Sequence, residues 1–158
     1  MPLEAYEERN KKFSNYIGQI KSVLHKLELE YKDSYLRDDQ VQGVMDLISN
    51  NHNVQRLSIC LTANQLTDVG VSKIFSTLGK VHNISTLSLI FDWNFEISNE
   101  SVKVLIITLK KLSNLSEFFV RMSYNTRVDD EGELMFVNAV KELPNIKKCT
   151  WDSKDILS

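Results

Sequence analysis

The chain has 158 residues, 42% of them hydrophobic and 25% charged, which is enough to bury one sizeable core. Its formal net charge of −2 gives no electrostatic case for binding nucleic acid or an anionic membrane. The longest apolar run, Val104 to Ile107, falls far short of the roughly 20 residues that cross a bilayer.

Two features of the sequence predict a reducing, cytoplasmic location. Cys60 and Cys149 lie far apart and form no Cys-x-x-Cys motif, as expected of free thiols. The N-terminal segment is acidic early and lacks the apolar stretch of a secretory signal. Neither feature suggests a disulfide scaffold.

The first 22 residues are predicted to form a helix, because Phe13, Ile17 and Ile20 recur at helical spacing and early glutamates suit the positive end of a helix dipole. From about residue 23 the pattern changes to short strands. Leu27, Leu29 and Tyr31 form the first, and Asp38 and Asp39 are expected to cap the helix that follows.

One sequence motif then recurs at a nearly constant interval. It reads NVQRLSICLTAN from residue 53, NISTLSLIFDWN from residue 83, NLSEFFVRMSYN from residue 114 and, shortened, NIKKCTWD from residue 145. The intervals are 30, 31 and 31 residues, and a fixed period in this range is typical of a stacked repeat array. Ser34 replaces the closing asparagine of the first copy.

An amphipathic helix is predicted after each strand except the last. The inner faces of the two central helices carry Val71, Ile74, Leu78 and Val102, Leu105, Leu109. Pro144 ends the last helix, and a polar tail follows the strand at 146–151. That strand is therefore expected to leave an open sheet edge. Either its charged residues discourage pairing with another strand, or a partner covers the edge.

The pattern NLxxLxLxLxxNxLxDxG, followed by an amphipathic helix, resembles leucine-rich repeats of the ribonuclease-inhibitor-like type, in a short form associated with protist proteins. The resemblance covers residues 23–152 and implies an α/β solenoid of about four strand–helix units with a parallel concave sheet. Residues 1–22 would form an N-terminal capping helix and 153–158 a tail, within one domain spanning 1–158. In such a family Asn64, Asn94 and Asn125 form a structural ladder.

Chemical motifs predict no enzyme and no cofactor or metal. The sequence contains no Gly-rich phosphate loop, no G-x-S-x-G and no His-Glu-x-x-His. Repeat position explains His25, His52 and His82 better than metal binding does. The acidic run 129–131 could be a calcium or catalytic cluster, but a helix cap with its first turn explains it better.

Residues that alternate outward from the strands should line the concave face. Ile90, Phe119 and Arg121 are predicted to form a contiguous patch there with Trp93 at its rim, and aromatic and arginine residues are frequent interface anchors. Candidate partner-binding residues on this side also include Arg56 and Glu117. The alternative is that Phe119 packs against neighbours and Trp93 folds under its loop.

The resulting hypothesis is a non-enzymatic module that binds protein partners as a small scaffold or structural subunit, with a cytoskeletal or ciliary assembly as one home. No nucleic acid, membrane or small-molecule substrate is expected. One alternative is a regulator of an enzyme or GTPase, either an inhibitor or a GTPase-activating factor. Another is the end of a larger complex that is unstable alone.

Overall fold

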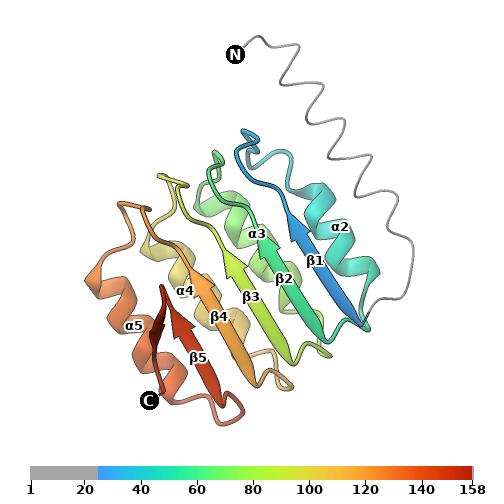
Figure 1. Cartoon of the computed structure of the whole chain (residues 1–158), viewed down its shortest axis with the longest axis vertical. Coiled ribbons are helices and arrows are strands. Elements are labelled where there is room, and N and C mark those ends of the chain that lie inside the picture. The colour runs from blue at the N-terminus through green and yellow to red at the C-terminus, as the bar shows by residue number, and fades with distance from the viewer. Residues whose placement is uncertain (1–24, 158) are drawn as a thin grey trace.

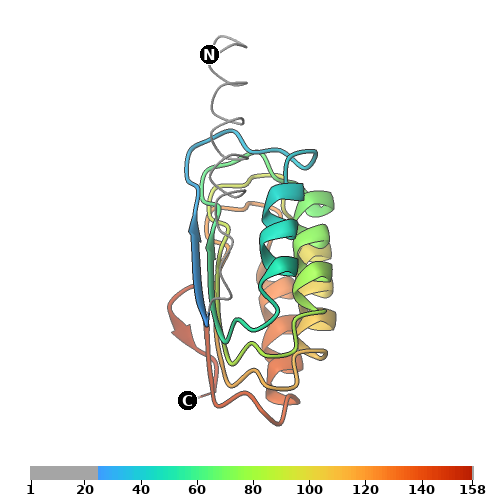
Figure 2. The same cartoon turned by 90° about the vertical axis from the view of Figure 1, so that its right-hand side faces the viewer.

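The computed structural model describes residues 25–157 as two layers, a sheet and a row of helices that covers one of its faces (Figures 1 and 2). From residue 26 to residue 151 strands and helices alternate along the chain, so each strand–helix pair is one repeat. The capping helix predicted over residues 1–22 lies outside the described residues. Among the helices that are described, none is long and apolar enough to cross a membrane.

Five parallel strands lie side by side in chain order, followed by a short antiparallel one. A strand residue faces its equivalent 30 or 31 positions later, as Leu57 faces Leu87 and Leu87 faces Phe118. The constant spacing in sequence therefore becomes a constant register in space. The strands are β1 (Lys26–Glu30), β2 (Arg56–Cys60), β3 (Thr86–Ile90), β4 (Glu117–Arg121), β5 (Lys148–Trp151) and β6 (Lys154–Asp155).

Four helices return the chain from one strand to the next. Three begin at side-chain caps, since Thr67, Ser98 and Asp129 each accept a hydrogen bond from a backbone amide of the first turn. The first described helix begins after Val41 and has no such cap, so the capping role predicted for Asp38 and Asp39 is wrong. The helices are α2 (Gln42–Asn50), α3 (Asp68–Leu78), α4 (Asn99–Leu109) and α5 (Asp130–Lys141).

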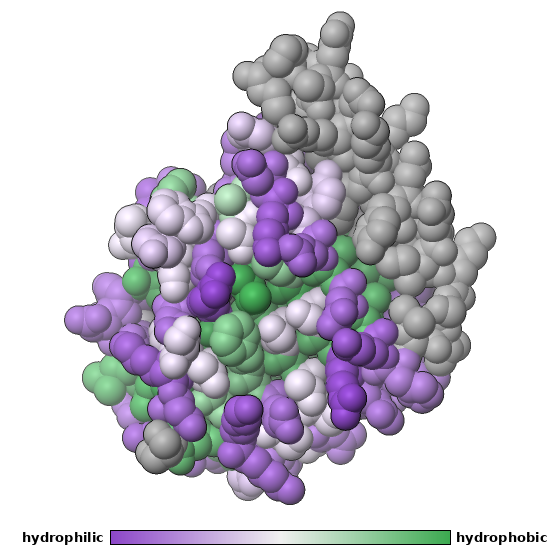
Figure 3. Space-filling view, viewed as in Figure 1, coloured by the Kyte–Doolittle hydropathy of each residue, from purple (hydrophilic) through white to green (hydrophobic). Residues whose placement is uncertain are grey.

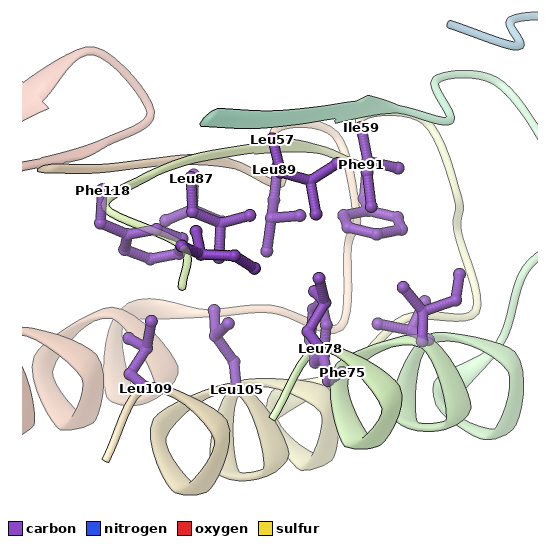
Figure 4. Packing of buried hydrophobic residues seen from close by; sticks show 14 of the residues in the cluster. Leu57, Ile59, Phe75, Leu78, Leu87, Leu89, Phe91, Leu105, Leu109 and Phe118 are labelled. Atoms are coloured by element: carbon purple, nitrogen blue, oxygen red, sulfur yellow. The ribbon is translucent and has the colours of Figure 1, made fainter. Parts of the chain in front are cut away.

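The core fills the space between the two layers. Alternate strand residues such as Leu57, Leu87 and Phe118 point toward the helices, where Leu105 and Leu109 meet them (Figure 4). All five are at most 3% exposed. Burying one such side chain contributes roughly 1.5–3 kcal/mol, and a repeat buries both its strand face and its helix face only when neighbours stack on it.

The C-terminal edge differs from the prediction of an open strand. Asp152 and Ser153 adopt φ values of 45° and 78°, which is the backbone of a tight two-residue hairpin turn. The chain folds back as β6, and the Ile156 amide donates to the Cys149 carbonyl at 2.9 Å. The tail predicted from residue 153 is therefore partly a strand, and its Ile156 is buried.

A ladder of buried asparagines ties the repeats together where the strands end. The Asn94 Nδ2 donates to the carbonyls of Leu61 and Phe91 at 3.0 and 2.9 Å, and its Oδ1 accepts from the Leu66 amide at 3.2 Å. The Asn125 Oδ1 accepts from the Asn94 amide at 2.6 Å. One amide side chain can do this because it both donates and accepts. Asn64 makes equivalent bonds to the first repeat.

A second, acidic ladder joins the starts of the helices. Asp68 accepts from the Ser98 amide at 2.9 Å and from the Ser101 hydroxyl at 2.5 Å, and Asp38 accepts from the Thr67 amide at 3.0 Å. Burial acts to raise the pKa of Asp68, but the hydrogen bonds from Ser101 and Ser98 outweigh it and the pKa is lowered. A Cβ added to Gly70 would lie 2.2 Å from the Asp38 Oδ1, so glycine leaves room for this carboxylate.

Candidate protein-binding surface

The sheet turns one face away from the helices, and the centre of this face is apolar. Figure 3 shows an apolar area over the middle strands with polar side chains around it. On this face Ile90 and Phe119 lie on neighbouring strands, and both are partly exposed. Charged side chains occupy the same rows on the outer strands, as Glu28 and Glu30 do on β1. The structure thus brings two of the predicted patch residues together.

Arg121 lies next to Ile90 in the register and forms an ion pair that the sequence did not reveal. Its Nε donates to the Asp92 Oδ2 at 2.5 Å, while the other carboxylate oxygen of Asp92 accepts from the Ser123 amide at 3.0 Å. The Asp92 side chain is 4% exposed and that of Arg121 is 41% exposed. Arg121 therefore neutralises a buried carboxylate and keeps part of its guanidinium at the surface.

Two shallow pockets divide the remaining predicted residues. Phe119 and Glu117 line one of about 160 Å³, between β3, β4 and β5. Arg56 lines another of about 250 Å³ on the N-terminal side, together with Lys26 and Glu28. Thr86 and Ser88 line both pockets, so Arg56 and Phe119 lie on the same face of the sheet, in adjoining hollows.

A group of exposed aromatic side chains lies beside the sheet face, in the loops that follow β3 and β4. Trp93 stacks on Tyr124 with ring centroids 4.1 Å apart and an interplanar angle of 15°. Phe95 meets Trp93 edge-on at 5.9 Å. The three residues are 43%, 61% and 52% exposed in the order Trp93, Tyr124, Phe95. They are called the aromatic cluster below, and the alternative that Trp93 folds under its loop is wrong.

The backbone holds two members of the aromatic cluster outward. Trp93 and Tyr124 have φ values of 59° and 64°, and each directly precedes an asparagine of the ladder. Asp33 and Ala63 adopt the same left-handed conformation in the earlier repeats, so the turn belongs to the repeat and not to the aromatic residues. This conformation costs a residue with a side chain roughly 1–2 kcal/mol, which the ladder offsets. Two large rings are thus displayed on a rigid turn.

Sequence reasoning placed Trp93 at the rim of a patch but did not include Tyr124 or Phe95. The signal was present for one of them, since Tyr124 follows Trp93 by 31 residues and occupies the same repeat position. Phe95 had no such signal, because Thr126 occupies the equivalent position in the next repeat.

A third pocket, of about 130 Å³, adjoins the aromatic cluster and is called the loop pocket. Tyr124 lines this pocket together with four carboxylate side chains, those of Asp129, Asp130, Glu133 and Asp152. The Asp129 Oδ1 accepts from the amides of Glu131 and Gly132 at 3.0 and 3.2 Å, which confirms it as a helix cap. The hydrogen bond from Asn99 is the main cause that lowers the pKa of Asp129. Within residues 25–157 no group of three acidic, histidine or cysteine side chains is arranged to hold a metal ion.

Comparison with known proteins establishes the fold type. Neither the family models nor the curated proteins that were searched match the chain. Among solved structures, it is similar to one described as leiomodin-1 actin-binding site 2, with a TM-score of 0.60 and 14% identity over 92% of this chain and 78% of that one. That domain has a leucine-rich-repeat-type fold, and the α/β repeat array of this chain is of the same type.

Proposed function

We propose that this chain is a non-enzymatic module that binds another protein through the aromatic cluster and the adjoining centre of the sheet face. The observation that carries the proposal is the exposure of Trp93, Phe95 and Tyr124 as one contiguous group. Aromatic side chains of this size are enriched in protein interfaces and supply most of the energy at their hot spots. Holding Trp93 and Tyr124 on left-handed turns lowers the conformational entropy that is lost when a partner binds.

The role that follows is that of a small scaffold or structural subunit in a larger assembly. We infer repeats of the ribonuclease-inhibitor-like type and a cytoplasmic, cytoskeletal home, with a ciliary assembly as one form of it. The similarity to a domain named for binding actin makes actin the first partner to test, on the strength of the shared fold alone.

Affinity capture from the protein's own cells tests the proposal. The wild-type chain should retain a stable set of proteins that a Trp93→Ala/Tyr124→Ala double variant loses while keeping its helical circular dichroism. A matched control is Ile107→Ala, because Ile107 is 55% exposed on α4 and belongs to the helix layer. Phe119→Ala then measures how much the sheet face contributes to binding the captured proteins. Arg121→Ala is avoided because it would leave the buried Asp92 carboxylate without its cation.

Co-sedimentation with filamentous actin and binding to monomeric actin are measured in parallel with the same variants. Loss of binding in the aromatic double variant, with Ile107→Ala unchanged, supports the surface. If the double variant captures the same proteins as the wild type, the aromatic cluster is not the binding surface. Capture of a GTPase whose hydrolysis rate the chain changes would instead support the regulatory alternative.

A further inference from the structure

We propose that the aromatic cluster and the loop pocket receive a basic segment of the partner, with an arginine or lysine side chain entering the pocket beside Tyr124. This inference rests on the proposed function and names the chemistry of the partner at the same surface.

Acidic residues dominate the loops that surround the aromatic cluster. Residues 91–98, 121–133 and 152–155 contain eight carboxylates and three cations, although the whole chain has a net charge of only −2. Each of the three cations is already engaged in an ion pair. These pairs are Arg121–Asp92 at 2.5 Å, Arg127–Glu96 at 2.6 Å and Lys154–Glu133 at 2.7 Å.

The carboxylates that remain give this edge its negative charge. Asp129, Asp130, Glu131 and Asp152 form no ion pair with any other residue in the described range 25–157. Asp130 and Glu131 are exposed, so their charge reaches the surface. The N-terminal end of the α5 dipole carries about half an elementary positive charge, which offsets part of this negative charge. The Asp129 carboxylate caps that end of the helix directly. A net negative field therefore surrounds the rings.

The loop pocket has the size and lining that suit a cationic side chain. Its volume of about 130 Å³ approaches the roughly 150 Å³ of a cavity that takes up benzene, so a planar guanidinium fits. Tyr124 offers an aromatic ring, and Asp129, Asp130, Glu133 and Asp152 supply acceptors around the same space. Aromatic and carboxylate groups together favour a cation over a neutral or acidic group.

The protein's own Lys154 already pairs with Glu133, one of the residues that line the loop pocket. Its ammonium contacts Glu133 at 2.7 Å, and its pKa is raised first by that hydrogen bond and also by the charges of Asp130 and Asp152. An ammonium is thus favoured here. Lys154 is 64% exposed in its side chain, so a partner cation can replace or join it.

Selection from random 12-residue peptides displayed on phage tests the inference without assuming a partner. Peptides are selected on the wild-type chain and counter-selected on the Trp93→Ala/Tyr124→Ala variant. We expect the surviving sequences to carry net positive charge with at least one arginine or lysine. A synthetic peptide from the selected group is then compared by calorimetry with its citrulline analogue, which keeps the shape of arginine without the charge.

The affinity should fall about tenfold for the citrulline analogue, in the range of a desolvated cation–π contact with an ion pair. Asp130→Asn/Asp152→Asn should weaken binding similarly, and Lys154→Gln should strengthen it severalfold by removing the internal competitor. The matched control is Glu28→Gln/Glu30→Gln, which removes two exposed carboxylates from β1 at the far side of the sheet. That control should leave the affinity unchanged.

Three results would overturn the inference. Cluster-dependent peptides that are neutral or acidic would refute the basic partner while leaving the proposed binding surface intact. Basic peptides that are weakened equally by the β1 control would show non-specific attraction. A selection that yields no cluster-dependent peptide would also refute it, and the capture experiment would then decide the proposed function separately.

Discussion

Replacing Asn94 with alanine gives the sharpest test of the asparagine ladder. Asn94 is fully buried and connects two repeats where β2 and β3 end. Its Oδ1 is the only acceptor for the buried Leu66 amide among the described residues. The carbonyls of Leu61 and Phe91 lose the Asn94 donor but each keeps another, from Asn64 and Asn125 respectively.

The expected cost follows from these partners. An orphaned buried amide costs about 1–3 kcal/mol, and each of the two lost bonds to a carbonyl that stays paired costs about 0.5–1.5 kcal/mol. We therefore expect Asn94→Ala to lower the free energy of unfolding by about 3 kcal/mol. A single domain has roughly 5–15 kcal/mol in total, so the variant folds but unfolds at clearly lower urea concentration.

Equilibrium urea unfolding, followed by circular dichroism, measures this cost, with an unchanged m-value showing that the same surface unfolds. Asn83→Ala is the matched control, because Asn83 occupies the exposed start of the same repeat. Within residues 25–157 its side chain makes a single hydrogen bond, from Nδ2 to the His52 carbonyl at 2.9 Å. It should cost less than about 1 kcal/mol. Equal losses for the two variants, or a loss below about 1 kcal/mol for Asn94→Ala, would refute a structural ladder.

Three further predictions concern other parts of the array. Gly70→Ala should destabilise the fold by about 1–3 kcal/mol in thermal unfolding, because the added Cβ would collide with Asp38. Gly79→Ala is the control and should be near neutral, because its Cβ would lie 3.2 Å from a flexible lysine side chain. Similar melting temperatures for the two variants would contradict this prediction. The lowered pKa of Asp68 means that its contribution is present above about pH 3.8 and is lost as the pH falls through the lower folded-state value. Asp68→Asn should therefore flatten the acid limb of a stability–pH curve, and a parallel curve would exclude the hydrogen-bonded carboxylate as the cause. Burial raises the pKa of the Cys149 thiol to about 12. Iodoacetamide at pH 8 should therefore modify Cys149 in urea but not in the native chain, which peptide mass spectrometry can show. Rapid labelling of the native chain would mean that the sheet edge at β5 opens.

The aromatic cluster also shows why a repeat protein can acquire a binding surface at little structural cost. The left-handed turn is present at this repeat position whether the residue is Ala63, Trp93 or Tyr124, each before a ladder asparagine, or Asp33, which precedes Ser34. Its side chain points away from the core, so its identity is unconstrained by packing. Two aromatic residues at successive repeats then lie one strand spacing apart, which is close enough for their rings to stack.

The repeat period in the sequence was sufficient to predict the strands, their parallel order and the side of each strand that is buried. The reason is that identical units can bury their apolar faces only by stacking in register, so Leu57, Leu87 and Phe118 must share a row. The positions of Asn64, Asn94 and Asn125 followed from the same period. The acidic run at Asp129 was also readable, because helix caps depend on local spacing.

Only the tertiary structure decided how side chains meet in the loops and at the end of the array. The pairing of Arg121 with the buried Asp92, the stack of Trp93 on Tyr124 and the hairpin that adds β6 all depend on backbone angles that alternation of apolar residues does not encode. Trp93 and Tyr124, 31 residues apart, meet there because both adopt the same left-handed conformation in neighbouring repeats. A periodic pattern specifies which faces are buried, whereas the contacts that form the candidate surface are set by the conformation of each turn.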